Sequence, residues 1–409
     1  TTQSNSFDLP EATLRAQTNS KWSKYGPDVL PAFVAEMDFR VAEPIQAAVR
    51  RIVDKTDYGY PMRNGAKAGS ALCAAFAERM KSRFGWTTDA ELALPLADLV
   101  QGTYAPVLAF SEPGDSVILQ MPSYPPFQEV LRVTGRRMIP LQMRDTGSSH
   151  VCRLEEIEKQ VDDRTRIFVL CNPQNPTGRV FSREDLLAFG KFAIERDMIV
   201  ISDEIHQDII YPGHTHIPFA SLGPDYAART ITITSATKSF NIPGLRSAIL
   251  HFGTPQLRDR FLGRIPARLM GDPNAIGVDA TIAAWREGQP WLDSVIAHLH
   301  RARDHMVRTI ESEVPQIKVH APDGTFLAWL DCTALGLNAP AFDFFHDKAK
   351  IAFSAGETFD PACAQFVRFN FATSMPILDG ILDRLVTSTR APESLSLCAS
   401  AISPSSGDR

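Results

Sequence analysis

Residues 166–178 read Arg-Ile-Phe-Val-Leu-Cys-Asn-Pro-Gln-Asn-Pro-Thr-Gly. Arg166 is followed by an apolar run with β-branched and aromatic residues, which is typical of a strand buried on both faces. The run ends at Asn172-Pro173, and Asn, Pro and Gly are residues that form turns. The stretch therefore predicts a central strand whose carboxyl end leads into a loop that presents polar groups.

The same arrangement recurs along the middle of the chain. Apolar runs occupy residues 116–120, 198–202 and 230–234, and residues 246–252 form a further predicted strand. Amphipathic stretches lie between these runs, and one begins at Ser182 with acidic residues in its first turn, which is a helix-start signal. Alternating strands and helices of this kind predict an α/β fold with a mostly parallel sheet wrapped by helices.

The chain divides into a large and a small predicted domain. Helical patterns run from about 255 to 314, and short strands at 326–331 and 366–371 then mix with helices at about 340–348 and 376–390. We expect residues 1–50 to form an N-terminal arm and part of the small domain, 51–290 the large domain, 291–391 a smaller α+β C-terminal domain, and 392–409 a disordered tail rich in Ser, Ala and Pro.

Composition argues against several classes of function. The 409 residues carry a net charge of −5, which disfavours nucleic acid or an anionic membrane surface as a partner. No apolar run approaches the ~18 residues of a membrane span, and the polar N-terminus lacks a signal-peptide core, so we expect a cytoplasmic protein. The six cysteines form no Cys-x-x-Cys pair and the ten histidines no His-Glu-x-x-His cluster, so we expect no metal site.

Polar and aromatic side chains follow the predicted strands. Tyr124, Asp203 and Lys238 each lie shortly after a strand end, and the carboxyl ends of parallel strands share one edge of a sheet. A lysine there can form an imine with a carbonyl, an aspartate can hold a cationic ring nitrogen, and a tyrosine can stack on a planar ring. Ser235 and the backbone amides after Gln101 can bind a phosphate. These groups together are the pattern of a pyridoxal phosphate enzyme.

Three motifs extend that pattern into a resemblance. They are Asn-Pro-x-Asn-Pro-Thr-Gly at 172–178, Ser-Asp-Glu-Ile-His at 202–206 and Ser-x-x-Lys at 235–238. On their order and spacing, the chain resembles the fold-type I pyridoxal phosphate enzymes of the aminotransferase class I/II family, from about residue 31 to about residue 385. Within that family it looks most like the cystathionine β-lyase-type C–S lyases, on the stretches 34–39, 58–60, 124–127, 216–219 and 238–242.

The resemblance implies a role for each motif residue around the cofactor. Lys238 would form the imine with pyridoxal phosphate and later move the substrate proton. Asp203 would pair with the pyridinium nitrogen, Asn175 would bond to the phenolate oxygen of the ring, and Tyr124 would stack on the ring as a further catalytic residue. His206 would also contact the cofactor, and it stands where the C–S lyase branch has His.

The resemblance also implies the groups that bind phosphate and substrate. Gly102, Thr103 and Ser235 would bind the phosphate, and Tyr60 of the partner subunit would reach it in a homodimer. Arg368 would take the α-carboxylate of a small amino-acid substrate as a bidentate fork. The expected substrate-binding positions are Ala35, Asn175, Arg368 and Tyr104.

Several positions depart from the C–S lyase branch. Arg246 lies eight residues after Lys238, where the wider aminotransferase family has a phosphate-binding arginine and this branch usually does not. Tyr104 lies in a segment where the branch has small aliphatic residues, and Glu36 replaces its usual Asp. These changes surround the substrate more than the cofactor. We therefore expect standard pyridoxal phosphate machinery and a different substrate.

The sequence favours a C–S β-lyase that cleaves an L-cysteine S-conjugate or a cystathionine-like thioether to thiol, pyruvate and ammonia, in a biosynthetic pathway for sulfur-bearing secondary metabolites. Two other reactions stay open, because motifs do not fix which bond to Cα breaks. They are transamination, which Arg246 favours, and decarboxylation-coupled oxidative deamination of a cysteine S-conjugate. A regulatory binding protein is a more distant alternative, since there is no basic stripe.

Overall fold

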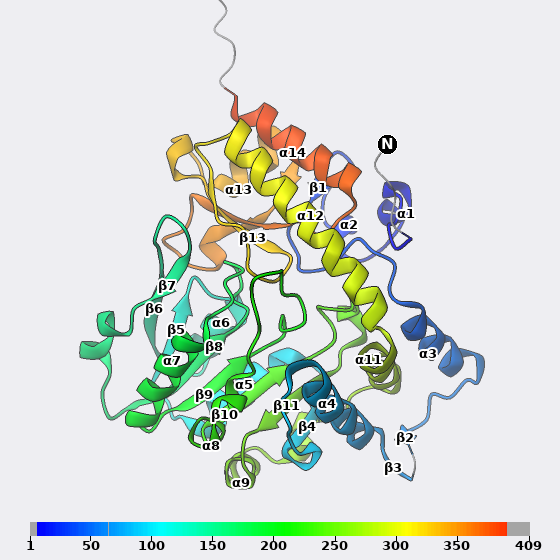
Figure 1. Cartoon of the computed structure of the whole chain (residues 1–409), viewed down its shortest axis with the longest axis vertical. Helices are drawn as coiled ribbons and strands as arrows, with labels where there is room; N and C mark the ends of the chain where they lie inside the picture. The colour runs from blue at the N-terminus through cyan, green and yellow to red at the C-terminus, as the bar shows by residue number, and fades with distance from the viewer. Residues whose placement is uncertain (1–5, 64, 391–409) are drawn as a thin grey trace, which may run out of the picture.

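The computed structural model describes residues 6–63 and 65–390 (Figure 1). The predicted tail at 392–409 lies outside these residues. Within the described part of the chain, no helix is both long and apolar enough to span a membrane.

An eight-stranded sheet forms the large domain, in the order β4-β11-β10-β9-β8-β5-β6-β7. Its five central strands run parallel, and the outer strands β4, β11 and β7 run antiparallel to their neighbours. The strands are β4 (Ala93–Leu96), β5 (Ser116–Met121), β6 (Arg137–Asp145), β7 (His150–Cys152), β8 (Thr165–Cys171), β9 (Ile199–Asp203), β10 (Thr230–Thr234) and β11 (Ala248–Phe252). The mostly parallel α/β sheet is confirmed; the strand expected at 246–252 begins two residues late, because Arg246 adopts a left-handed φ of 41°.

The strands β5, β9, β10 and β11 are buried on both faces, as the runs at these positions predicted. Successive side chains of a strand point to opposite faces, so Val117 and Leu119 join one hydrophobic cluster and Ile118 joins another. The helices of the large domain are α3 (Glu43–Asp54), α4 (Ala68–Phe84), α5 (Leu99–Phe110), α6 (Pro125–Val133), α7 (Arg183–Glu195), α8 (Pro224–Ala227), α9 (Pro255–Arg264), α10 (Ala267–Met270) and α11 (Ala275–Glu287). As expected, α7 begins after Ser182, whose hydroxyl accepts the Asp185 amide in a capping box.

A second, smaller sheet has the antiparallel order β12-β13-β16-β15 and defines what we call the small domain. The strands of this sheet are β12 (Lys318–Val319), β13 (Leu327–Asp331), β15 (Ser354–Ala355) and β16 (Phe366–Asn370). The small domain also contains α13 (Ala341–Phe344) with a π turn (Phe345–Ala349), β14 (Ile351–Ala352) and α14 (Met375–Thr389). The 25-residue α12 (Gln289–Glu313) crosses from the large domain to this sheet and packs beside α14 (Figure 1).

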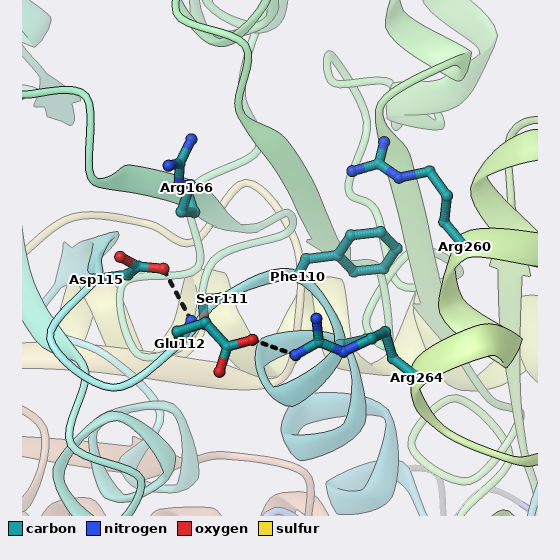
Figure 2. Close-up of a pocket in the computed structure, with 8 residues that line it drawn as sticks. Phe110, Ser111, Glu112, Asp115, Arg166, Arg260 and Arg264 are labelled. Atoms are coloured by element: carbon teal, nitrogen blue, oxygen red, sulfur yellow. Dashed lines mark hydrogen bonds and ion pairs between the residues drawn. The ribbon is translucent and has the colours of Figure 1, made fainter.

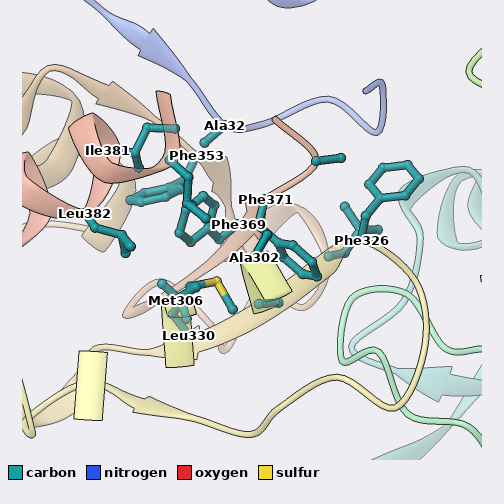
Figure 3. Close-up of a cluster of buried hydrophobic side chains, with 14 of the residues drawn as sticks. Ala32, Ala302, Met306, Phe326, Leu330, Phe353, Phe369, Phe371, Ile381 and Leu382 are labelled. Carbon is teal, nitrogen blue, oxygen red and sulfur yellow. The ribbon is translucent and has the colours of Figure 1, made fainter. Parts of the chain in front are cut away.

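The N-terminal segment contributes to the core of the small domain. It contains α1 (Glu11–Arg15), α2 (Ser20–Ser23) and β1 (Leu30–Pro31), and β1 pairs with β14 in parallel. Phe7, Leu14 and Trp22 belong to the same buried cluster as Phe369 of β16 and Leu382 of α14. Figure 3 shows Phe369 and Leu382 in this cluster, together with Ala32 of the N-terminal segment. The N-terminal segment is therefore packed as part of the small domain, although it is distant from that domain in sequence.

Candidate active site

Four adjacent strands deliver the motif residues to one edge of the sheet. In the order β10-β9-β8-β5, Asp203 is the last residue of β9, and the loops after β10, β8 and β5 carry Lys238, Asn175 and Tyr124. Two further contributions come from outside the sheet, the Ala35 carbonyl of the N-terminal segment and Arg368 of β16. The site therefore lies where the two domains meet.

Lys238 is held by the backbone of the N-terminal segment. Its Nζ donates a hydrogen bond to the Ala35 carbonyl oxygen at 3.0 Å. Burial, followed by the positive charge of Arg368, lowers the pKa of Lys238 to about 8. Roughly a tenth of this amine is consequently neutral at pH 7, far more than for an ordinary lysine with a pKa of about 10.4, and the neutral form is what a nucleophile or a proton acceptor requires.

Asp203 is a buried carboxylate without a cationic partner in any ion pair of the described residues. Its Oδ1 accepts the backbone amide of Ile205 at 3.1 Å. Burial raises the pKa of Asp203 to about 7. The carboxylate of the neighbouring Glu204, by contrast, forms hydrogen bonds with Ser202 Oγ at 2.9 Å, His216 Nε2 at 3.1 Å and the Phe219 amide at 2.9 Å. These contacts give Glu204 a structural role. Asp203 alone is left to receive a cationic group from a ligand.

Arg368 is a buried guanidinium that binds only neutral acceptors among the described residues. Nη1 donates to Asn175 Oδ1 at 3.0 Å, and Nη2 donates to the Phe33 carbonyl at 2.9 Å and to Ser354 Oγ at 3.0 Å. The guanidinium also lies 4.8 Å from the ring centroid of Phe359, and its Nε is buried with no hydrogen-bond partner. Burial lowers the pKa of Arg368 to about 10. An unneutralised buried cation is costly, so this site favours an anionic ligand.

Two uncharged side chains, His206 and Tyr124, lie close enough to these charged groups to be affected by them. His206 is buried, and burial together with the positive charges of Lys238 and Arg368 lowers its pKa to about 3, so the ring is uncharged at neutral pH. Its Nδ1 has no hydrogen-bond partner within the described chain. Burial raises the pKa of Tyr124, and the charges of Arg368 and Asp203 both act on its hydroxyl. Tyr124 therefore belongs to the same cluster.

The start of α5 lies beside this cluster. Asp98 caps the helix by accepting the Val100 amide at 2.7 Å, and Gly102 and Thr103 follow in its first turns, both buried. A Cβ at Gly102 would meet Ile233 of β10 at 2.9 Å, so only glycine lets the helix approach the sheet this closely. Helix N-termini with free amides favour anions.

Ser235 and Arg246 have partners of their own in this region. Ser235 Oγ donates to the Ser247 carbonyl at 2.5 Å and accepts the Thr237 amide at 3.0 Å. The largely exposed Arg246 is ion-paired with Asp98, which places its charge at the N-terminus of α5.

Two predicted residues have no contact with this cluster in the structure. Tyr104 lies on α5 and pairs with Glu129 of α6, and none of the interactions found for it involves Lys238, Asn175 or Arg368. Tyr60 is completely exposed. Conversely, no motif pointed to Phe33 or Ser354, which bind Arg368 through a backbone carbonyl in the N-terminal segment and through a hydroxyl on β15.

A cavity of roughly 480 Å³ on another part of the large domain is separate from this site (Figure 2). Asp115 and Arg166 in its wall lie at the amino ends of β5 and β8, whereas the candidate site lies at the carboxyl ends. Glu112 within it is ion-paired with Arg264. The cavity therefore contributes nothing to the groups described above.

Comparison with known proteins places the chain in a family. A model described as "Aminotransferase class I and II" matches residues 38–385, so the chain belongs to this family. It is 34% identical over 386 residues to a cystathionine β-lyase, PatB, from Bacillus subtilis, which covers 93% of this chain and 98% of that protein.

Solved structures give the same family likeness. The crystal structure of OvoB is 36% identical with a TM-score of 0.86, covering 92% of this chain and 97% of that one. A pyridoxal phosphate-bound C–S lyase from Staphylococcus hominis is 27% identical with a TM-score of 0.84, covering 92% and 96%.

The geometry fits the cofactor that the sequence implies. A buried carboxylate with a raised pKa suits a protonated ring nitrogen, and a lysine with a pKa lowered to about 8 suits imine formation. The helix start at Gly102 suits a phosphate. All three groups lie at the same sheet edge.

The pKa of Lys238 predicts how the cofactor-free protein reacts with pyridoxal phosphate. Only the neutral amine attacks the aldehyde, so the rate should rise with pH and reach half its maximum at about pH 8. An ordinary lysine would require a pH of about 10.4. Stopped-flow absorbance from pH 6 to 10 measures this rate. A midpoint above pH 9.5 would contradict the burial argument.

Gly178 couples the Asn175 loop to the small domain. It has a φ of +72°, its amide donates to the Gln174 carbonyl at 2.7 Å, and its carbonyl accepts the Gly324 amide at 3.0 Å. A Cβ here would lie 2.5 Å from the Cβ of Pro322. Both the backbone conformation and the packing therefore require glycine.

Replacing Gly178 with alanine should destabilise the protein by about 2 to 4 kcal/mol through strain and overpacking. Gly213→Ala is the matched control, because Gly213 has a φ of +93° with nothing within 4 Å of a built Cβ. It should cost about 1–2 kcal/mol. Denaturant unfolding of both variants provides the comparison, and equal losses would show that the Pro322 contact is unimportant.

Proposed function

We propose that this chain is a pyridoxal phosphate-dependent C–S β-lyase that cleaves an L-cysteine S-conjugate or cystathionine-like thioether to thiol, pyruvate and ammonia. The observation that carries the proposal is the cluster of Lys238, Asp203 and Arg368 at the domain junction. It supplies an amine with a lowered pKa, a partner for a cationic ring and a buried cation for a carboxylate. Similarity to a cystathionine β-lyase and to a C–S lyase supports the choice of reaction.

The proposed cofactor site uses the residues at the sheet edge. Lys238 would bind pyridoxal phosphate covalently, Asp203 would face its ring nitrogen, and Asn175 would face its phenolate oxygen. Tyr124 and His206 would flank the ring. The phosphate would lie between Gly102 and Thr103 near the start of α5 and Ser235 directly after β10. Arg246 would lie beside it.

When bound, pyridoxal phosphate supplies a ring that withdraws electrons from the Cα of an amino acid. Arg368 binds the substrate α-carboxylate through its guanidinium, which orients the Cα–H bond toward Lys238. The Lys238 amine takes this proton, and the electron pair left on Cα forms a Cα–Cβ double bond as the thiolate leaves. Overall, the thioether and one water give the thiol, pyruvate and ammonium, with no oxidant.

We further propose that the enzyme acts as a homodimer in the cytoplasm. Tyr58, Tyr60 and Met62 are exposed within one short segment, which suits burial against a second subunit. Tyr60 of the partner subunit would then complete the phosphate site. A pathway that builds sulfur-bearing secondary metabolites is the proposed setting.

One assay separates the proposed reaction from transamination. β-Elimination needs no second substrate, whereas transamination stops after one turnover unless a keto acid regenerates the cofactor. Purified enzyme with S-ethyl-L-cysteine should therefore release thiol through many turnovers without keto acid. Turnover that depends on an added keto acid would support the aminotransferase alternative, which the phosphate-side position of Arg246 favours.

A further inference from the structure

Residues 33–39 of the N-terminal segment pass both Arg368 and Lys238, and we call this stretch the crossing segment. Arg368 Nη2 donates to the Phe33 carbonyl at 2.9 Å, and Lys238 Nζ donates to the Ala35 carbonyl at 3.0 Å. These carbonyls are two residues apart in the chain. The position of the crossing segment is therefore coupled to the positions of both side chains.

Both of these charged groups bind cofactor or substrate in the proposed reaction, so other contacts are needed to hold the crossing segment. Asn370 of β16 supplies the first of them. Its buried side chain donates through Nδ2 to the carbonyls of Val34 at 2.6 Å and Glu36 at 2.7 Å. Its Oδ1 accepts the Ala372 amide at 2.9 Å, which fixes the orientation of the asparagine amide. The carbonyl of Ala35 thus lies between two anchored neighbours.

Asn241 supplies the second anchor, three residues after Lys238. Its Oδ1 accepts the Met37 amide at 2.9 Å. Its Nδ2 donates to the carbonyls of Met37 at 2.9 Å and Phe39 at 3.0 Å. The oxygen and both hydrogens of this side-chain amide are consequently used on the crossing segment.

The backbone at Asn241 joins this anchor closely to the lysine. Asn241 has a φ of 56°, in the left-handed region that asparagine adopts more readily than most other residues. The Ile242 amide donates to the Thr237 carbonyl at 3.0 Å and closes a turn that contains both Lys238 and Asn241. A single short turn therefore carries the reacting amine and the anchor of the segment that binds it.

We propose that Asn241 is a positioning residue of the β-lyase reaction, which fixes the crossing segment so that the Ala35 carbonyl orients the free Lys238 amine toward the substrate Cα. The inference rests on the proposed function and adds to it a residue outside the cofactor contacts. The amine ends a flexible four-carbon chain, so it needs a fixed acceptor to stay in one orientation. Misplacement by about 1 Å can reduce a rate by about 10²-fold.

Asn241→Gly tests this role, because glycine keeps the left-handed backbone and removes only the side-chain contacts. The kcat for thiol release from S-ethyl-L-cysteine, normalised to bound cofactor by absorbance, should fall by about tenfold to hundredfold. KM should change much less, since the lost contact acts on the reacting step. Substrate deuterated at Cα should react more slowly in this variant, because proton transfer to Lys238 limits its rate.

Hydrogen exchange gives a second readout on the cofactor-free protein. Peptides that contain the Met37 amide should exchange faster in Asn241→Gly, whereas the amides of β5 should exchange as in the wild-type protein. Asn241→Asp is a second variant, which keeps the acceptor for the Met37 amide and loses the two donated hydrogen bonds. It should also lower kcat.

Lys350→Gly is the matched control for the change to glycine. Lys350 is exposed, has a left-handed φ of 55° and directly precedes β14 of the small domain. This variant should keep the wild-type kcat and the wild-type exchange at Met37.

Asn241→Gly with the wild-type kcat would overturn the inference and leave the lyase function standing. A lower kcat with equal rates for the two isotopic substrates would also overturn it, because the loss would then lie outside proton transfer. Wild-type enzyme that releases no thiol would contradict the lyase function itself, and the inference with it.

Discussion

Lys238→Ala is expected to reduce kcat for thiol release from S-ethyl-L-cysteine by at least about 10³-fold. The substitution removes both the covalent bond to the cofactor and the proton acceptor, and general acid–base catalysis alone contributes about 10²–10⁴-fold. The absorbance band of the cofactor–lysine imine should disappear as well. Initial rates and absorbance spectra of purified wild-type and variant enzyme measure both effects.

A surface lysine provides the control for this variant. Lys191 is a largely exposed residue of α7, and its Nζ lies 3.8 Å from the Glu195 carboxylate. It lies in the last turns of this helix, away from the candidate site. Lys191→Ala should keep the wild-type rate and spectrum. A Lys238→Ala enzyme that retained a tenth of the wild-type rate would contradict the central role of this lysine.

Arg368→Met should lower kcat/KM, because it removes the buried cation that binds the substrate α-carboxylate. Loss of a buried, hydrogen-bonded charge contact costs about 2–5 kcal/mol, so kcat/KM should fall by roughly 30-fold to several thousand-fold. Arg368 also donates hydrogen bonds to Asn175 Oδ1, the Phe33 carbonyl and Ser354 Oγ. Its removal leaves these acceptors without a donor, so the melting temperature should fall as well.

Arg136→Met separates this effect from the general loss of a buried arginine. Arg136 is also buried, but it donates to the carbonyls of Ser111 and Thr134 at 2.6 Å each, distant from the strand-end cluster. Removing it leaves buried acceptors unsatisfied and should lower the melting temperature without changing KM. If Arg368→Met instead left KM unaltered, Arg368 would not be the carboxylate site.

The strands β5, β8, β9 and β10 could be predicted because they are short runs of apolar and β-branched residues with polar or aromatic residues shortly after them. The strands β4, β6 and β7 at and near the sheet edges were not predicted. The side-chain alternation of β5 between two clusters explains why both faces of the run 116–120 are buried. Lys238, Asp203, Asn175 and Tyr124 could be placed together for the same reason, since parallel strands bring their carboxyl ends to one edge.

The contributions of the small domain could not be predicted in the same way. The resemblance predicts Arg368, but not its contacts. Phe33 is 335 residues away in sequence and Ser354 is 14 residues away, and only tertiary packing brings them to the guanidinium. The pairing of Arg246 with Asp98 likewise joins a loop to a helix start that no local pattern connects. The interaction of Tyr104 with Glu129 depends on the packing of α5 on α6.

The most direct test of the account is a product balance from the purified enzyme with S-ethyl-L-cysteine under air and without keto acid. Free thiol, pyruvate, ammonia and oxygen uptake would be quantified in the same sample. The account predicts equal amounts of thiol, pyruvate and ammonia over many turnovers with no oxygen consumed. A stalled half-turnover without thiol, or a sulfur-bound aldehyde formed with oxygen uptake, would contradict it.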